Sequence, residues 1–137
     1  MMNPSNLERC DYKGKMTVAK ILIVEDYPVT QRVLSLTLKN SGHDVQIANH
    51  GLEALDCLNL GPVDLALVDI AMPEMDGLEL LRQLRKDERY NALPVIMLTA
   101  SGQDEDRATA LHIGADGFLT KPTSSRELLE TINRFVG

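Results

Sequence analysis

Four short apolar runs of the chain each end at a residue type that is used in phosphate or metal chemistry. Glu25 and Asp26 follow KILIV, Asp69 follows VDLALV, Thr99 closes PVIMLT, and Lys121 follows GFLT. Taken singly, such residues are more often helix caps, turn residues or solvated charges. If the four runs are parallel strands of one sheet, however, their carboxyl ends meet at one edge, where ligands bind in open α/β sheets.

Three of these side chains are carboxylates, which repel one another when they are close. Neighbouring strands lie ~4.8 Å apart, and two carboxylates ~4 Å apart repel by about 4 kcal/mol at an effective dielectric of 20. Either one acid stays protonated or a cation lies among them. A small, hard divalent ion with oxygen ligands fits best, so we expect Mg²⁺, with Lys121 as a further positive charge that salt-bridges the acids.

The same set of side chains suits the transfer of a phosphoryl group. An aspartate can attack phosphorus and form an acyl phosphate, while a metal ion neutralises charge on the transferring group. A lysine ammonium and a threonine hydroxyl can hold the remaining phosphoryl oxygens. The residue types therefore predict an aspartyl-phosphate site.

The remaining sequence predicts the elements that place these side chains. Strands are expected at 20–24, 44–48, 63–68, 94–99 and 117–120, and the more polar second strand is expected at an edge of the sheet. Helices are expected from Pro28 to about Gly42, over 51–58, 78–85 and 104–113, and from Ser124 or Ser125 to the end. This alternation predicts an α/β fold with a parallel sheet covered by helices on both faces.

Apolar residues recur at helical spacing within three of these predicted helices. Val29, Val33 and Leu36 do so in the first helix. In the third, Leu78, Leu81 and Leu84 are expected to be buried, and in the last, Leu128, Ile132 and Phe135 are expected to point inward.

Bulk composition narrows the functional classes. The chain of 137 residues predicts one domain, with residues 1–18 as a polar tail and residues 19–137 as the folded unit. A net charge of −6 without a basic run argues against direct nucleic-acid binding. Cys10 and Cys57 lack metal-ligand spacing, and no apolar run approaches the ~20 residues needed to cross a bilayer, so a cytoplasmic location is expected.

From Ala19 to its C-terminus, the chain resembles a response-regulator receiver domain of the CheY-like kind. The resemblance rests on Glu25-Asp26, VDIAMPEMDG, LTA, GADGF and KP, in their order and spacing. It implies a (βα)₅ flavodoxin-like, doubly wound, five-stranded parallel sheet with strand order 2-1-3-4-5, an order for which this type of protein is the standard example.

The resemblance also implies roles for individual residues. Asp69 would be the phosphoacceptor, and Mg²⁺ would be held by Glu25, Asp26, Asp69 and the backbone carbonyl of Ala71. Thr99 and Lys121 would contact the phosphoryl group.

Further residues of the family pattern concern the switch and the lifetime of the phosphoryl group. Pro122 would follow a cis peptide bond. Phe118 occupies the switch position where the family often has tyrosine, and it can move inward behind Thr99 but has no hydroxyl group. Ala71 and Ser101 occupy positions that affect how long the phosphoryl group survives, and the apolar Ala71 predicts no unusually rapid hydrolysis.

The implied function is signalling by a phosphoprotein of a two-component system rather than enzymatic turnover. Asp69 would take the phosphoryl group from a histidine kinase or phosphotransfer protein, and the face formed by the fourth helix, fifth strand and fifth helix would change its affinity for a downstream protein. Self-phosphorylation from small donors and slow dephosphorylation are the only reactions expected. Neither nucleic acid nor membrane is an expected partner, and the chain would be a monomer or a phosphorylation-dependent dimer.

Other interpretations stay open at this point. The chain could be a receiver-like interaction module that acts without phosphorylation, or a receiver fragment of a larger regulator or hybrid kinase. A nucleotide or flavin binder is disfavoured because EDYP offers carboxylates where phosphate would need free amides. A small Mg²⁺-dependent phosphatase would need a general base that the sequence does not show.

Overall fold

The computed structural model describes residues 19–72, 75–100 and 104–136, with side chains from 107 onward in the last segment. The predicted tail, Cys10 and Ser101 therefore lie outside the described residues. The strands are β1 (Lys20–Val24), β2 (Asp44–Ala48), β3 (Leu65–Asp69), β4 (Val95–Thr99) and β5 (Gly117–Thr120). The helices are α2 (Pro28–Asn40), α3 (Gly51–Leu60), α4 (Gly77–Lys86), α5 (Asp104–Ile113) and α6 (Ser125–Val136).

All five strands form one parallel sheet in the order β2-β1-β3-β4-β5, which confirms the predicted topology. In the register of the sheet, Val24 pairs with Val68 and Asp69 pairs with Leu98. The strand β2 lies at an edge, as its polarity indicated. Several boundaries differ from the prediction by one or two residues. In particular, β3 begins at Leu65 rather than at position 63, and Asp69 is its last residue rather than the first residue after it.

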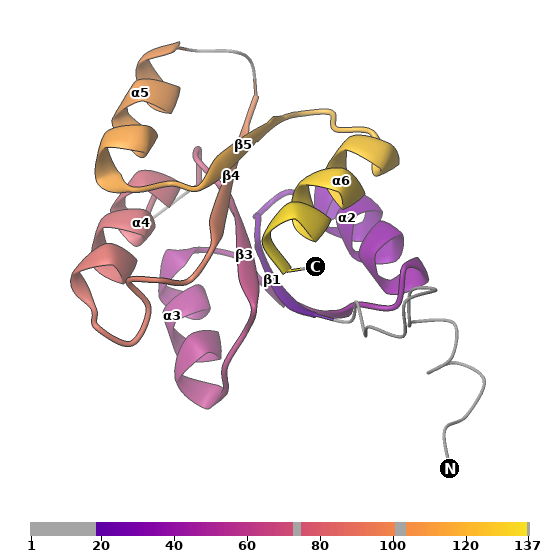
Figure 1. The fold of residues 1–137 in the computed structure, drawn as a ribbon, viewed down its shortest axis with the longest axis horizontal. Coiled ribbons are helices and arrows are strands. Elements are labelled where there is room, and N and C mark those ends of the chain that lie inside the picture. Colours follow the sequence, from indigo (N-terminus) through magenta and orange to yellow (C-terminus); the bar gives the residue numbers. More distant parts are fainter. Residues whose placement is uncertain (1–18, 73–74, 101–103, 137) are drawn as a thin grey trace.

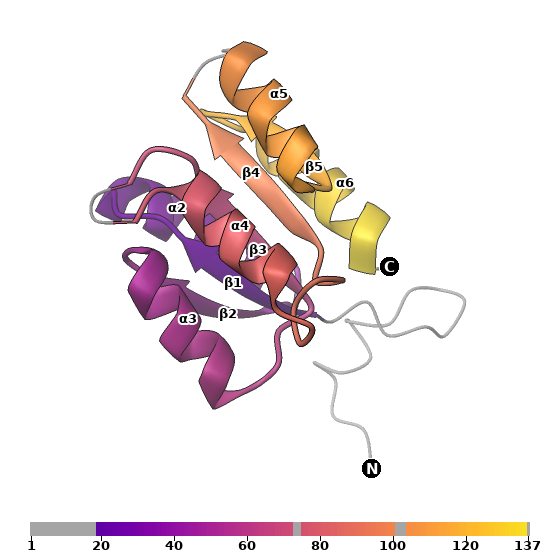
Figure 2. The ribbon, with the colours of Figure 1, turned by 90° about the vertical axis from the view of Figure 1, so that its left-hand side faces the viewer.

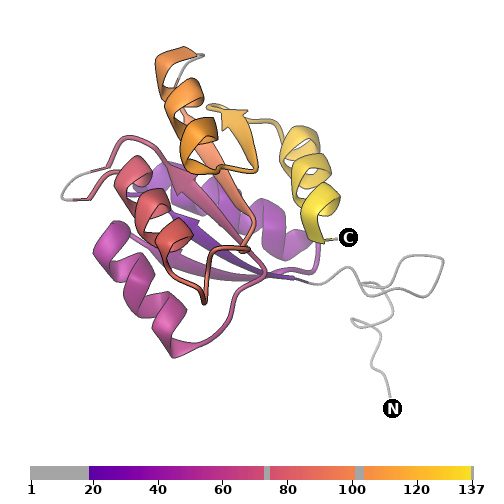
Figure 3. The ribbon, with the colours of Figure 1, turned by 60° about the vertical axis from the view of Figure 1, so that its left-hand side comes forward.

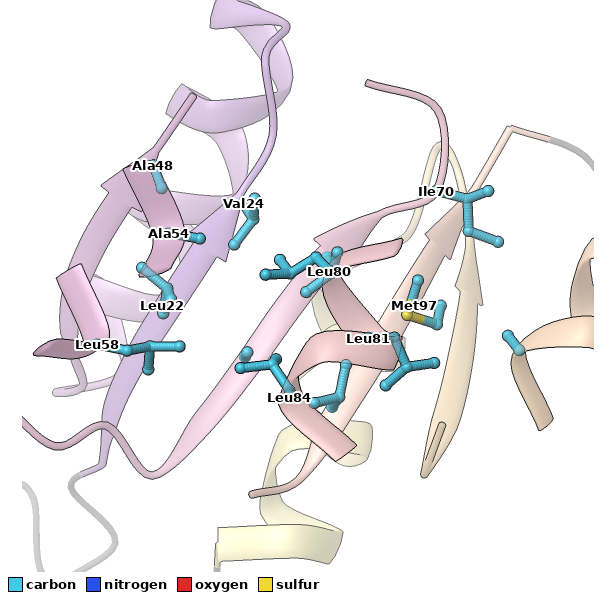
Figure 4. Close-up of a cluster of buried hydrophobic side chains, with 14 residues drawn as sticks. Leu22, Val24, Ala48, Ala54, Leu58, Ile70, Leu80, Leu81, Leu84 and Met97 are labelled. Carbon is cyan, nitrogen blue, oxygen red and sulfur yellow. The ribbon is translucent and has the colours of Figure 1, made fainter. Parts of the chain in front are cut away.

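Helices cover both faces of the sheet, as Figure 1 shows in an edge-on view. One face carries α3, α4 and α5, which lie in front of the strands in Figure 2. The other face carries α2 and α6. Each side has its own aliphatic cluster, one centred on Leu22, Val68, Leu80 and Met97 (Figure 4) and the other on Ile23, Leu67, Ile96 and Leu98. Burial on both faces explains why β1, β3 and β4 are almost wholly apolar.

The helices do not all bury the residues that recur at helical spacing in the sequence. In α2, Leu34 and Leu38 are buried, whereas Val29, Val33 and Leu36 are each more than half exposed. This helix carries apolar side chains along two stripes, and only one of them meets the sheet. The spacing therefore identified the helix but not its buried side.

The other two helices follow their predicted pattern more closely. In α4, Leu81 and Leu84 are buried as expected; Leu80 is buried as well, while Leu78 is only half-buried, so the prediction for Leu78 was wrong in degree. In α6, Leu128 and Ile132 are buried. Phe135 is half-buried against the same cluster as these two residues.

An arginine fastens the amino-terminal edge of the sheet, on the side opposite the candidate site. Arg85 on α4 donates from Nε to the carbonyl of Gly114 (2.9 Å), from Nη1 to the carbonyls of Tyr90 and Leu93, and from Nη2 to Asp116 Oδ2 (2.9 Å). Asp116 also accepts from the amide of Val95 (2.8 Å). This network ties α4 to the end of α5 and to the start of β4. Because the guanidinium is planar and presents several donors, one side chain can join all three segments.

Within the described ranges, no helix combines the length and the apolar composition that crossing a membrane requires.

Candidate functional site

The carboxyl ends of β1, β3, β4 and β5 lie along one edge of the sheet (Figure 3), and the predicted site residues lie at these ends, as expected from the topology. Glu25 follows β1 directly and its amide donates to the carbonyl of Ala48 (3.0 Å). The adjacent strands β3 and β4 end at Asp69 and Thr99. Lys121 follows β5, and its amide donates to the carbonyl of Thr99 (2.7 Å), which fixes the start of this connection against β4.

Three carboxylates form a compact oxygen cluster at this edge. Glu25, Asp26 and Asp69 each offer one oxygen atom, and these atoms lie within 4.8 Å of one another. Glu25 is fully buried and Asp69 nearly so, whereas Asp26 is exposed. An all-oxygen set with one solvent-facing acid suits a hard divalent ion that keeps some of its water ligands, and these residues therefore fit Mg²⁺.

Lys121 makes ion pairs with both buried acids. Its Nζ lies 2.7 Å from Glu25 Oε1 and 3.1 Å from Asp69 Oδ2. The lysine was predicted to salt-bridge the acids, and the structure places it there. With all four groups ionised, three carboxylates and one ammonium carry a net charge of −2, which a single divalent cation neutralises.

The pKa values of the buried groups reflect this crowding. Burial raises the pKa of Glu25 above its ordinary value, and the neighbouring Asp69 raises it further, while Lys121 lowers it in part. For Lys121, burial lowers the pKa, but the hydrogen bonds to Glu25 and Asp69 outweigh that effect and raise it overall. The lysine is therefore charged at neutral pH, and the cluster resists full ionisation of its acids.

The raised pKa of Glu25 predicts a pH-dependent contribution to stability. A carboxyl that binds its proton more tightly in the folded state stabilises the fold below its ordinary pKa of 4.5, and this contribution is lost as the pH rises through the folded-state pKa. Glutamine cannot titrate. With EDTA present, the free energy of unfolding of wild type minus that of Glu25→Gln should therefore fall as the pH rises above 4.5, measured in urea titrations. A difference independent of pH would contradict this prediction.

Thr99 presents a buried hydroxyl group that has no hydrogen-bond partner among the described residues. The residue is only 4% exposed. Leaving a buried polar group unpaired costs about 1–3 kcal/mol, so this hydroxyl is suited to a ligand that reaches the site. The phosphoryl contact predicted for Thr99 fits that arrangement.

Of the remaining predicted residues, Ala71 and Pro122 lie beside the site, whereas Phe118 lies further along the sheet. The amide of Ala71 donates to Asp69 Oδ1 (3.2 Å), which places Ala71 next to the acceptor, and the bond between Lys121 and Pro122 is cis. Phe118 is half-buried on the face covered by α5 and pairs in register with Met97, two residues before Thr99. The guanidinium carbon of Arg107 lies 5.1 Å from the centroid of its ring.

Two polar residues at the site were not singled out in the sequence. Gln31, on α2, donates from Nε2 to the backbone carbonyl of Glu25 and to Asn49 Oδ1. Asn49 precedes α3 and in turn donates to Glu53. A glutamine in a helix and an asparagine in a loop are common, so neither carries a sequence signal of its own; only the fold brings them together.

Comparison with known proteins agrees with this geometry. The response regulator receiver domain family matches residues 21–133. The transcriptional regulatory protein CpxR homolog of Haemophilus influenzae is 44% identical over 115 residues, which cover 84% of this chain and 49% of that protein. The chain thus spans about half the length of the curated relatives it matches.

Solved structures show the same fold. The chemotaxis protein CheY4 of Vibrio cholerae is 33% identical, with a TM-score of 0.82 over 86% of this chain and 98% of that one. The receiver domain of the sensor histidine kinase PA1611 from Pseudomonas aeruginosa, solved with a magnesium ion coordinated in its active-site cleft, is 33% identical, with a TM-score of 0.81 over 87% of this chain and 98% of that one. From its strand order, its acidic edge and the match over residues 21–133, the chain belongs to the response regulator receiver domain family.

Proposed function

We propose that this chain is the phosphoacceptor of a two-component system and that Asp69 takes the phosphoryl group in the presence of Mg²⁺. The observation that carries the proposal is the convergence on Asp69: two further acids lie within 4.8 Å by their oxygen atoms, and Lys121 Nζ lies 3.1 Å away. The buried, unpaired hydroxyl of Thr99 at the adjacent strand end supports it.

In the proposed reaction, a carboxylate oxygen of Asp69 forms a bond to phosphorus while the bond between phosphorus and a donor histidine nitrogen breaks. The nitrogen keeps the electron pair of that bond. Glu25, Asp26 and Asp69 would hold Mg²⁺, which when bound would neutralise charge on the transferring group. Lys121 and Thr99 stabilise the product by holding phosphoryl oxygens, because ammonium and hydroxyl groups donate to them. The backbone carbonyl of Ala71 is proposed as a further metal ligand.

An exposed apolar surface beside the site supports the proposal that the phosphoryl donor is a protein. The side chains of Val29, Val33 and Leu36 on α2 are exposed, and the first two also line a pocket of about 300 Å³ between this helix and the segment after β5. Lys121 and Pro122 line the same pocket. A histidine kinase or phosphotransfer protein that covers this surface would bring its histidine to the edge that carries Asp69.

The signal would leave the site through Thr99 and Phe118. These residues belong to the paired strands β4 and β5, on the same face, with Phe118 two pairs further from the edge. We propose that a phosphoryl group on Asp69 draws Thr99 inward, that Phe118 follows, and that the face of α5, β5 and α6 then binds a downstream protein differently. Unchanged NMR shifts on this face after addition of beryllofluoride and Mg²⁺ would contradict this route.

The phosphoacceptor role is tested with acetyl phosphate. Wild type is expected to gain the mass of one phosphoryl group when Mg²⁺ is present and not when EDTA is present, and Asp69→Asn is expected to gain none. Asp56→Asn, which makes the same change at an exposed position of α3, should behave as wild type.

Each other outcome has a definite meaning. A mass gain that persists in Asp69→Asn would place the acceptor elsewhere. No gain in wild type, in a sample where a known receiver is phosphorylated, would favour an interaction module that acts without phosphorylation. Repeated turnover of phosphate esters would favour a phosphatase.

A further inference from the structure

The backbone groups and one carboxylate oxygen of Glu25 make hydrogen bonds, and its other carboxylate oxygen makes only an ion pair. Its amide donates to the carbonyl of Ala48 (3.0 Å), and its Oε2 accepts from the amides of Asp26 (3.0 Å) and Tyr27 (3.3 Å). Its Oε1 pairs with Lys121 (2.7 Å). The last group, its backbone carbonyl, accepts from the side chain of Gln31.

Both hydrogen-bonding groups of the peptide between Glu25 and Asp26 therefore have a side-chain partner. Its N–H group is held by Glu25 Oε2, and its C=O group is held by Gln31 Nε2. The orientation of this peptide plane determines the direction of the Asp26 side chain relative to that of Glu25. Asp26 is the exposed acid of the cluster, so its position depends on the backbone more than on packing around its side chain.

Gln31 is itself anchored from the neighbouring loop. Its Nε2 donates to Asn49 Oδ1 (2.7 Å), and Asn49 donates from its amide and its Nδ2 to Glu53 Oε1 (3.2 and 3.1 Å). Glu53 lies in the first turn of α3, where its amide donates to His50 Nδ1 (3.2 Å). The start of α2, the end of β1 and the start of α3 are thus joined by one chain of hydrogen bonds.

We propose that Gln31, supported by Asn49, is a positioning residue of the metal site: it fixes the peptide between Glu25 and Asp26 and so sets the geometry of the two acids. The inference rests on the metal site of the proposed function and adds residues that do not touch the ion. Mg²⁺ demands near-ideal octahedral ligand geometry. Residues that orient metal ligands typically change metal affinity by about 10–100-fold when they are removed.

The experiment measures the affinity of the protein for Mn²⁺, an octahedral stand-in whose free form is quantified by electron paramagnetic resonance. Gln31→Met keeps the length of the side chain and removes its donors. We expect its dissociation constant for Mn²⁺ to rise about 10-fold. Gln83→Met makes the same change at an exposed position of α4 and should leave the constant unchanged.

A second variant tests the path through Asn49. Asn49→Ala should weaken Mn²⁺ binding in the same direction, and the double variant should bind about as weakly as Gln31→Met alone, because both residues act through one chain of bonds. If circular dichroism shows that Gln31→Met is unfolded, the Mn²⁺ affinity of Asn49→Ala tests the proposal instead. Equal affinities in wild type and the folded variants, or strictly additive losses, would overturn the proposal.

Loss of stability alone gives a different result. A purely structural Gln31 would lower the free energy of unfolding in EDTA and leave the Mn²⁺ constant of the folded protein unchanged, which would also overturn the proposal. If wild type itself binds no Mn²⁺, the metal site of the proposed function fails and this inference with it. If wild type binds and the variants match it, only this inference fails.

Discussion

Lys121→Met is expected to make the folded state depend on a divalent ion. The variant removes the only positive charge seen within 3.1 Å of the buried acids among the described residues, and Glu25 is fully buried. Removing one partner of a buried ion pair typically costs ~3–5 kcal/mol. We expect about 3 kcal/mol at pH 7, at the lower end of that range, because Lys121 is partly exposed and Glu25 can take up a proton.

Two conditions should reverse the effect of Lys121→Met. Mg²⁺ at about 100 times its dissociation constant adds ~2.7 kcal/mol to the free energy of unfolding if it binds only the folded state. Acid protonates Glu25 and so narrows the gap to wild type. Urea titrations of wild type and Lys121→Met give the free energy of unfolding in EDTA, with added Mg²⁺ and at lower pH.

Lys86→Met supplies the control for this prediction, because Lys86 is exposed at the end of α4, away from the acids. Its effect should stay within about 1 kcal/mol, since only a favourable interaction with the helix dipole is lost. A Lys121→Met protein as stable as wild type in EDTA at pH 7 would show that the lysine does not compensate the buried acids.

Gly77→Ala is expected to damage both the fold and the site. A Cβ atom at Gly77 would lie 2.2 Å from the carbonyl oxygen of Asp69 and 2.9 Å from Ile70 Cα, and both are backbone atoms. The amide of Gly77 also donates to the carbonyl of Ile70 (2.9 Å), so α4 begins against the segment that carries the acceptor. The methyl group can be accommodated only if this segment moves.

Overpacking of this kind costs about 1–3 kcal/mol or more, and the movement should also reduce phosphorylation of Asp69. The same substitution at Gly61 is the control. Its nearest neighbour would be the flexible Lys20 Nζ at 3.8 Å, and its backbone is extended (φ 177°). Gly61→Ala should therefore change the free energy of unfolding by less than ~1 kcal/mol. Thermal denaturation and acetyl phosphate labelling of both variants measure the contrast, and equal behaviour would contradict it.

The sequence was sufficient to predict the order of the elements and the convergence of the chemical groups. Strands buried on both faces are continuous apolar runs, so their ends are sharp in the sequence, and Glu25, Thr99 and Lys121 stand at those ends. Parallel topology then requires them to meet at one edge. These residues could be predicted because each one directly follows or ends the apolar run that forms its strand.

Features that depend on contacts between distant segments could not be predicted in this way. The spacing of Val29, Val33 and Leu36 fits a helix, but Leu34 and Leu38 form the stripe that meets the sheet. Spacing alone cannot choose between two apolar stripes. The hydrogen-bond partners of Gln31 and Arg85 lie in loops that are distant in sequence, and no local sequence pattern predicts these contacts.

The Arg85 network anchors only one end of α5. Its carboxyl-terminal end is fastened through the carbonyl of Gly114, whereas its first residue, Asp104, follows only five positions after Thr99. At 1.5 Å per residue, the ten residues of this helix span about 15 Å. A displacement of the carboxyl end of β4 would therefore move the amino-terminal end of α5 further than the end that Arg85 holds at Gly114.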